Sequence, residues 1–257
     1  MEKYTMIIRP DKISEKLSHS AREILHCHGM VEDAENPHTI IVIGGDGTYL
    51  RAVHQYIDHL DSVRFFGIHT GTLGFCSDYK DKELEDFLNV LIHNTGKEEP
   101  FPLLQASVEA KTWYGLNEIR IENVSRTQVL DVSINEDSLE TFRGSGMCIC
   151  TQLGSTAYNR SLGGAVIQEG LDLIEMTEIA GIHHSQYRSL DAPLVLRGDS
   201  VLQFKSSSFK GAVLGADQFV DSLDCYKEIT VRICPDKKVY ILRGKTVSYF
   251  DRLKSLF

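Results

Sequence analysis

The sequence lacks the features that mark several common classes of protein. No run approaches the ~20 apolar residues of a membrane-spanning helix, and residues 1–10 contain neither a long apolar stretch nor a cleavage signal. Basic residues are scarce, with 27 Lys and Arg against 36 Asp and Glu, so the net charge is −9. Because binding to nucleic acid or to anionic lipid needs a basic face, we expect neither a nucleic-acid partner nor a membrane.

Cysteine pairs of the kind that bind zinc are also missing. The six cysteines form no CxxC motif. Cys148 and Cys150 alternate in an expected strand, so both side chains should face the same way into a core. Without a secretion signal, this use of cysteine predicts a reduced, cytoplasmic protein.

Two familiar nucleotide-binding motifs are absent as well. The chain contains no GxxxxGK[ST] loop and no GxGxxG fingerprint. These absences exclude a Walker-type ATPase and a typical Rossmann dehydrogenase.

The first hundred residues alternate apolar strands with amphipathic helices, which is typical of an open, wound, parallel sheet. Residues 39–43 are β-branched throughout, as in a strand buried on both faces. The expected strands are residues 4–8, 39–43 and 63–68, and the expected helices cover residues 13–25, 50–60 and 84–91. This half is therefore predicted to be an α/β domain.

The pattern changes after Pro100 and Pro102 to short alternating strands, which predicts a β-rich, sandwich-like half. The expected strands are residues 119–121, 130–134, 195–204, 228–234 and 239–242, with turns at 135–137, 198–199 and 235–236. One helix is expected at about residues 171–180, and a closing helix is expected to carry Val247, Phe250, Leu253 and Phe257.

The most informative segment is the glycine-rich turn Gly44-Gly45-Asp46-Gly47-Thr48, between an expected buried strand and an expected helix. Glycines let the backbone turn sharply and approach a ligand closely. The free N–H groups at the start of a helix favour an anion, typically phosphate. A carboxylate there is unfavourable unless it binds Mg²⁺ on the phosphates or takes the proton of an attacking hydroxyl, so Asp46 is the candidate catalytic residue.

A second turn, residues 67–75, follows the next expected strand and contains His69. It should lie beside the first turn at the carboxyl edge of the sheet, where wound α/β proteins bind ligands. A lone histidine is more often a structural or surface residue, and its place in this turn makes a position lining the ligand site an equal alternative for His69.

Polar groups of the second half form weaker signals. Asn117 and Glu118 precede an alternating strand and have the chemistry to bind ribose hydroxyls and an amide. The segment 151–158 is rich in small residues and hydroxyls and ends in Tyr158, which suits an adenine ring. Asp217 is a lone acid after an apolar run, and its residue type alone favours a position on the surface.

Taken in order, these segments resemble the NAD kinase family. The matching motifs are GGDGT at 44–48, GIHTGTLGF at 67–75, NE at 117–118, GSTAY at 154–158, SLGG at 161–164 and the aspartate at 217. The first of them is shared with lipid kinases, whereas its combination with NE and GSTAY is specific.

The resemblance implies phosphorylation of the 2′-hydroxyl of the adenosine ribose of NAD to give NADP. The donor would be ATP with Mg²⁺ or another divalent metal, or polyphosphate, and the protein would be a homodimer or homotetramer. It also implies two domains, residues 1–100 and 101–242, with about residues 243–257 returning to the first.

Carried over by position, Asp46 would activate the ribose hydroxyl, and the backbone of residues 44–48 would hold the donor phosphates. Asp217 would lie near the reacting ribose. The residues that the resemblance assigns to substrate and cofactor binding are Gly44, Gly45, Gly47, Thr48, His69, Gly71, Phe75, Asn117, Glu118, Ser145, Thr156, Ala157, Tyr158, Ser161, Ala180 and Asp217, and none is assigned to a metal.

Two departures from the family pattern concern the NAD pocket. Ser145 stands where the family usually has an aspartate, and Gln152 and Leu153 replace a proline and a hydroxyl residue. These changes predict altered NAD affinity more than altered chemistry at Asp46.

Two other functions are compatible with parts of the pattern. A lipid kinase would need a hydrophobic acceptor slot, and the motifs at 117–118 and 154–158 argue against it. A non-catalytic dinucleotide-binding homologue would have lost Asp46, which is present.

Overall fold

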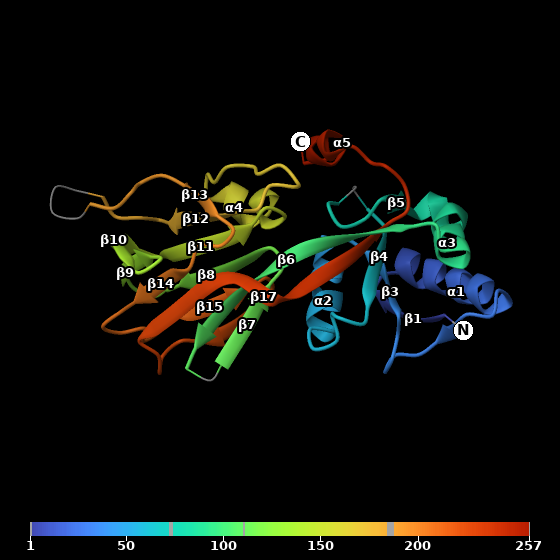
Figure 1. Cartoon of the computed structure of the whole chain (residues 1–257), viewed down its shortest axis with the longest axis horizontal. Helices are drawn as coiled ribbons and strands as arrows, with labels where there is room; N and C mark the ends of the chain where they lie inside the picture. Colours follow the sequence, from blue (N-terminus) through green and yellow to red (C-terminus); the bar gives the residue numbers. More distant parts are fainter. Residues whose placement is uncertain (1, 72–73, 110, 184–187, 257) are drawn as a thin grey trace. The chain divides into compact units, whose positions relative to one another are not determined.

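The computed structural model describes residues 2–71, 74–109, 111–183 and 188–256, and Figure 1 shows the course of the chain. The chain divides into two compact units, one of residues 1–101 with 237–257 and one of residues 102–236. Strands β6 (Lys97–Val108) and β17 (Glu228–Arg243) each run along the chain from one unit into the other. Three positions named above, Thr72, Leu73 and Phe257, lie outside the described residues.

The first unit contains a parallel sheet in the order β17-β4-β3-β1-β2. The bounds are β1 Lys3–Ile8, β2 Val31–Glu32, β3 Thr39–Gly44, β4 Arg64–His69 and the short β5 Tyr79–Lys80, which pairs with β4. The helices are α1 Lys12–Cys27, α2 Asp46–Gln55, α3 Leu84–His93 and α5 Tyr249–Lys254, with a 3-10 turn at Asp81–Glu83. Every residue of β3 is buried, as the β-branched run at residues 39–43 predicts.

Helices cover both faces of this sheet. Helices α1 and α3 share one apolar cluster with the sheet, in which Phe87 of α3 stacks on Phe66 of β4 with ring centroids 4.0 Å apart. Helix α2 places Tyr49 against Phe65 of β4 at 5.8 Å. Because Phe65 and Phe66 are neighbours in a strand, they point to opposite faces, so α2 lies on the other side.

The second unit is an antiparallel β-sandwich. One sheet has the order β13-β12-β11-β8-β15-β16; in the other, β10-β9-β14-β17 are joined by β6 and β7 beside β17. The bounds are β7 Lys111–Gly115, β8 Glu118–Glu122, β9 Gln128–Ile134, β10 Asp137–Gly144, β11 Gly146–Thr151, β12 Leu173–Ile179, β13 Leu194–Arg197, β14 Leu202–Lys205, β15 Val213–Ala216 and β16 Phe219–Ser222. A 3-10 turn at Gly154–Thr156 and the short helix α4 (Tyr158–Ser161) follow β11.

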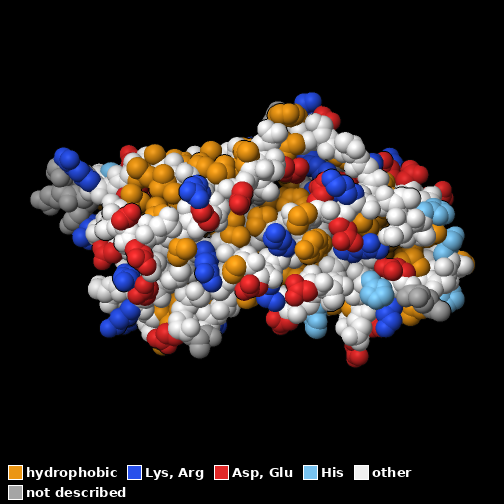
Figure 2. Space-filling model, in the orientation of Figure 1, with side chains coloured by type: hydrophobic (Ala, Val, Ile, Leu, Met, Phe, Trp, Pro, Cys, Tyr) orange, Lys and Arg blue, Asp and Glu red, His pale blue; other side chains and the backbone are white. Residues whose placement is uncertain are grey.

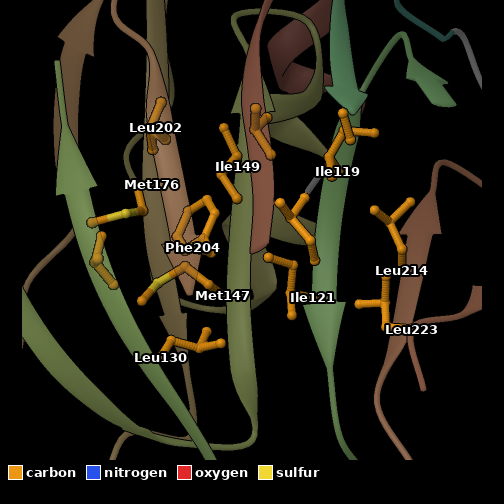
Figure 3. Packing of buried hydrophobic residues seen from close by; sticks show 14 of the residues in the cluster. Ile119, Ile121, Leu130, Met147, Ile149, Met176, Leu202, Phe204, Leu214 and Leu223 are labelled. Atoms are coloured by element: carbon orange, nitrogen blue, oxygen red, sulfur yellow. The ribbon is translucent and has the colours of Figure 1, made fainter. Parts of the chain in front are cut away.

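The core of the second unit consists of alternate residues from both sheets. Ile119, Met147 and Ile149 from one sheet and Leu130 and Phe204 from the other are all fully buried in one apolar cluster (Figure 3). Period-two alternation of this kind is what the sequence of the β-rich half shows. The predicted fold class, a wound α/β part followed by a β-rich part, is confirmed.

Three predictions about single elements are wrong. Residues 171–180 are not a helix: Leu173–Ile179 forms β12, in which Ile174 and Met176 alternate into the core and override the helical preference of Leu, Glu and Met. Pro235 and Asp236 do not form a turn, since β17 continues through them; proline fixes φ near −65°, which extended backbone tolerates. The helix predicted at residues 50–60 is α2, which already ends at Gln55. There the N–H of Tyr56 is shared between the carbonyls of Ala52 and Val53, because the last turn tightens.

Leu60 lies beyond the end of α2 and still packs in the core, with 1% of its surface exposed. The closing helix is present as α5, which begins at Tyr249 after the N-cap residue Ser248, so Val247 lies outside it while Phe250 and Leu253 lie within it. Within the described residues, no helix combines the length and the apolar character needed to cross a membrane.

Candidate active site

A first cluster of polar groups lies at the carboxyl ends of β3 and β4. Gly44, which ends β3, pairs with His69, which ends β4, so the turns after the two strands start side by side. A side chain at Gly44 would collide with Thr48, because an added Cβ would lie 2.4 Å from its hydroxyl oxygen. No described side chain caps the α2 N-terminus at Gly45, which leaves its backbone N–H groups open to an anion.

Asp46 is the first residue of α2 and is half-buried. Its carboxylate accepts hydrogen bonds from two consecutive backbone N–H groups, from Phe75 to Oδ2 at 3.1 Å and from Cys76 to Oδ1 at 3.3 Å. Gly74 lies against the same carboxylate and against His69, since an added Cβ would be 2.2 Å from Asp46 Oδ1 and 2.5 Å from His69 Nε2. The second turn thus holds the Asp46 carboxylate in one orientation.

His69 is buried, and neither of its ring nitrogens has a hydrogen-bond partner among the residues the structure describes. Burial lowers the pKa of His69, and the nearby Asp46 carboxylate opposes this change only in part. The ring is therefore neutral at physiological pH. A buried polar group without a partner is unusual, and the imidazole is available to a ligand.

The other expected residues of this cluster differ in exposure. Thr48 is buried, whereas Gly47 and Gly71 are exposed. Phe75 is buried and meets the ring of Tyr249 edge-on at 6.2 Å between centroids. Phe75 is thus a packing residue whose backbone, rather than its ring, touches Asp46.

A second cluster lies in the second unit, around the turn before β8. The Asp217 carboxylate accepts from three successive N–H groups, those of Leu116 at 2.8 Å, Asn117 at 2.8 Å and Glu118 at 3.2 Å. Asp217 has a φ of +51°, which is rare for a residue with a Cβ. Its backbone N–H in turn donates to the Glu118 carbonyl at 3.0 Å. The turn is therefore held in a fixed shape by a residue about 100 positions later.

Glu118, the first residue of β8 after this turn, is a buried acid with 6% of its surface exposed. Burial, reinforced by the charge of Asp217, raises the pKa of Glu118 to about 7, and Arg120 only partly offsets this effect. Arg120 Nε lies 3.9 Å from Glu118 Oε1, and the described residues offer no hydrogen-bond partner to Oε2. Glu118 therefore presents an unused oxygen.

The loop after β11 packs directly on the same turn. An added Cβ at Gly154 would lie 2.0 Å from the Asn117 carbonyl oxygen, so only glycine fits. The Thr151 hydroxyl donates to the Leu116 carbonyl at 2.7 Å and accepts from the Gly154 N–H at 3.2 Å. The structure thus brings the motifs at 117–118 and 154–158 together, as their proposed shared ligand requires.

Tyr158 begins α4 and is half-buried. Its hydroxyl lies 3.3 Å from Glu122 Oε1, and the Arg120 guanidinium lies over its ring, 5.1 Å from the centroid. Burial is the main cause of the raised pKa of Tyr158. Of its neighbours, Thr156 and Ala157 are half-buried and Ser161 is exposed.

Ser145 and Ala180 are also neighbours. The Ser145 N–H donates to the Ile179 carbonyl at 2.9 Å. Ala180 is exposed and left-handed, with a φ of +47°. An added Cβ at Gly144 would lie 2.6 Å from the Ala180 carbonyl oxygen. Both expected residues therefore belong to one surface of the second unit.

Sequence reasoning missed the network that supports the loop after β11. Glu175 of β12 is fully buried and accepts from Asn159 Nδ2 at 2.8 Å and from the Ala165 N–H at 2.7 Å. The Thr177 hydroxyl donates to Asn159 Oδ1 at 2.7 Å. The sequence signal for this network was the acid Glu175 between the apolar residues Ile174 and Met176. Because the segment was predicted to be a helix, Glu175 was not recognised as a buried residue of a strand.

The described residues contain no group of three or more His, Cys, Asp or Glu side chains that could hold a metal ion. Mg²⁺ often keeps several waters and is bound through one or two carboxylates together with substrate phosphates. The single carboxylate of Asp46 in an anion-binding turn fits a cation of that kind.

The fold defines a class of proteins in which a wound α/β unit with a glycine-rich turn is followed by an antiparallel β unit. Yeast NADH kinase complexed with NADH superposes with a TM-score of 0.83 at 20% identity, covering 100% of this chain and 86% of that one. An NAD kinase from Archaeoglobus fulgidus in complex with ATP gives 0.81 at 21% identity, with 98% and 99% covered. These likenesses show the fold.

The family follows from the sequence. Residues 7–96 match the ATP-NAD kinase N-terminal domain, and residues 116–243 match the ATP-NAD kinase C-terminal domain. The NAD kinase of Latilactobacillus sakei is 36% identical over 253 residues, which are 96% of this chain and 91% of that protein. NAD kinase 1 of Oceanobacillus iheyensis is 33% identical over 261 residues, 99% of this chain and 97% of that protein.

The chain belongs to the NAD kinase family. Its activity is that of the family, the ATP-dependent phosphorylation of NAD to NADP.

The raised pKa of Glu118 makes its contribution to stability depend on pH. The raised pKa means that the folded state favours the protonated form of Glu118. This contribution to stability is fully present below pH 4.5, where the acid is protonated in both states, and it is lost as the pH rises through about 7. Glu118→Gln cannot lose a proton. Its free energy of unfolding should therefore improve relative to the parent, by on the order of 2–3 kcal/mol, between pH 5 and pH 8.

Urea unfolding at the two pH values measures this change. Glu136→Gln, in an exposed turn, is the control and should show the same difference from the parent at both. A pH-independent difference for Glu118→Gln would contradict the prediction.

Proposed function

We propose that the chain transfers the γ-phosphoryl group of ATP in line to NAD, with Asp46 as the general base. The observation that carries this proposal is the Asp46 carboxylate, held by two N–H groups at the start of a helix. Asp46 takes the proton of the ribose 2′-hydroxyl while that oxygen bonds to the γ-phosphorus. The bond from this phosphorus to the β–γ bridging oxygen breaks, and ADP leaves.

The N-terminus of α2 supports a site for the donor phosphates. Backbone N–H groups at Gly45 to Gly47 and the helix dipole both favour an anion there. The neutral ring of His69, buried and without a described partner, is a further group for this ligand. A divalent cation held by the donor phosphates would neutralise the charge on the phosphoryl group.

The second unit supports binding of the dinucleotide. Asn117 and Glu118 stand on a fixed turn, and the Gly154 loop packs on that turn. Tyr158, with Thr156 and Ala157, is proposed to hold the adenine ring. The yeast protein of the same fold is an NADH kinase with NADH bound, and we propose that the surface around Asn117, Glu118 and Tyr158 binds NAD in this chain.

The geometry favours a different role for Asp217 than direct contact with the reacting ribose. Its carboxylate already accepts three N–H groups from the turn at residues 116–118. We therefore propose that Asp217 holds Asn117 and Glu118 in position.

Asp46→Asn tests the proposed base. The amide keeps the shape of the side chain but cannot accept the proton, so kcat should fall by about 10²–10⁴ while the protein still folds. Steady-state assay of NADP formation from NAD, ATP and Mg²⁺ measures the effect. Asp58→Asn, an exposed carboxylate beyond α2, is the control. Near-parental kcat in Asp46→Asn would remove Asp46 from the chemistry.

Ser145→Asp tests the departure in the dinucleotide pocket. The longer, charged side chain should accept a hydrogen bond from the substrate, worth about 1.5–3 kcal/mol, or roughly ten- to hundredfold in affinity. Because water competes for the same hydrogen bond, only part of this free energy contributes to binding. KM for NAD should therefore fall several-fold at unchanged kcat. Ser138→Asp, on the exposed end of β10, is the control. An unchanged or higher KM would mean that this pocket binds NAD without a carboxylate at position 145.

We also propose a cytoplasmic homo-oligomer, a dimer or tetramer, assembled through the second unit. The edge strands β13 and β16 carry Val195, Phe219 and Val220, which are 43%, 46% and 63% exposed. Figure 2 shows apolar side chains gathered over the margin that carries β12 and β13 in Figure 1. Unpaired strand edges and apolar patches need covering. Light scattering at micromolar concentration should give at least a dimer mass, and a fully active monomer would refute this.

A further inference from the structure

Two arginines near the C-terminus converge on the segment that holds Asp46. Arg243 ends β17 and Arg252 lies in α5, and 8% and 3% of their surfaces are exposed. Arg252 Nη1 donates to the Phe75 carbonyl at 3.1 Å and to the Ser77 carbonyl at 3.2 Å. Arg243 Nη2 donates to the same Phe75 carbonyl at 3.3 Å. Two cations thus bind one backbone oxygen.

The carbonyl of Phe75 and the N–H of Cys76 belong to one peptide unit. That N–H donates to Asp46 Oδ1 at 3.3 Å, while the carbonyl at the other side of the plane accepts from both arginines. Because a peptide unit is planar and stiff, fixing the carbonyl also fixes the direction of the N–H. A cation on the carbonyl oxygen also polarises the amide and makes its N–H a stronger donor.

Asp78 keeps the two arginines together. It is buried, and its carboxylate accepts from Arg252 at 2.6 Å, from Arg243 at 3.2 Å and from the Gly244 N–H at 3.3 Å. One buried carboxylate between two guanidinium groups offsets their repulsion. The arrangement joins α5, the end of β17 and residues 75–78 into one polar cluster within the first unit.

We propose that Arg243 and Arg252 are positioning residues for Asp46, acting through the Phe75–Cys76 peptide. The inference rests on the proposed role of Asp46 as base. The arginines orient and polarise the N–H that holds the carboxylate toward the ribose hydroxyl, so these two side chains support catalysis without touching the substrate. Misplacing a reacting group by about 1 Å costs roughly a hundredfold in rate.

Arg252→Met is the direct test, because methionine fills the space of the side chain without binding the two carbonyls. We expect kcat to fall about ten- to hundredfold, with KM for NAD and for ATP within about twofold of the parent. The matched control is Lys254→Met in the same helix, which removes an exposed ion pair with Asp251 and should leave kcat unchanged. A parental kcat in folded Arg252→Met, or a loss that appears only in KM, would overturn the proposal.

A double-mutant cycle with Asp46→Asn separates positioning from general damage. If Arg252 acts through Asp46, the double variant should turn over no more than about twofold slower than Asp46→Asn alone. An equal loss in both backgrounds would overturn the inference. Parental turnover in Asp46→Asn alone would instead refute the proposed base, so the two failures are distinguishable.

Arg252→Lys covers the case in which Arg252→Met does not fold. Lysine keeps a charge beside Asp78 but lacks the planar fork that spans two carbonyls and a carboxylate. Its melting temperature should stay close to that of the parent while kcat falls several-fold. A parental kcat in Arg252→Lys together with failure of Arg252→Met to fold would reduce Arg252 to a structural ion-pair partner and overturn the proposal.

Discussion

The functional turns of this protein depend on carboxylates that accept backbone N–H groups from distant parts of the chain. Asp46 holds the amides of Phe75 and Cys76, and Asp217 holds those of Leu116, Asn117 and Glu118. Four of these amides lie outside the helices and strands, and that of Glu118 lies at the first residue of β8. A buried amide without a partner costs about 1–3 kcal/mol, so these contacts decide which conformation each turn adopts.

A few buried polar atoms near these turns have no hydrogen-bond partner among the described residues. Both ring nitrogens of His69 and Oε2 of Glu118 are buried without a partner among the described residues. His69 ends β4, before the turn whose amides Asp46 accepts, and Glu118 begins β8, directly after the turn that Asp217 holds. A rigid frame that carries unused polar atoms is pre-organised for a ligand, because little conformational freedom remains to be lost on binding. The desolvation that raises the pKa of Glu118 is a cost to stability that such a site carries.

The elements that sequence patterns predict well are those whose pattern and packing agree. Residues 39–43 are uniformly β-branched and form the fully buried β3, and the helical spacing around Phe87 gives α3. Prediction failed at Leu173–Ile179, where the residues favour a helix but β11 offers antiparallel pairing and a core for Ile174 and Met176. It failed again at Pro235, which lies at an exposed position within β17, where a proline removes no packing from the core.

The sequence alone determined the chemistry of the phosphate turn, since Gly44, Gly45 and Asp46 are neighbours in the chain and their conformational and acid–base properties are local. It also determined the family, through short motifs in a fixed order. Only the tertiary structure decided what holds those motifs in place. Arg252 meets the Phe75 carbonyl across 177 positions, and Asp217 meets the N–H of Leu116 across 101. Such contacts have no local pattern, because a hydrogen bond requires atoms within about 3 Å, and folding alone brings remote segments to that distance.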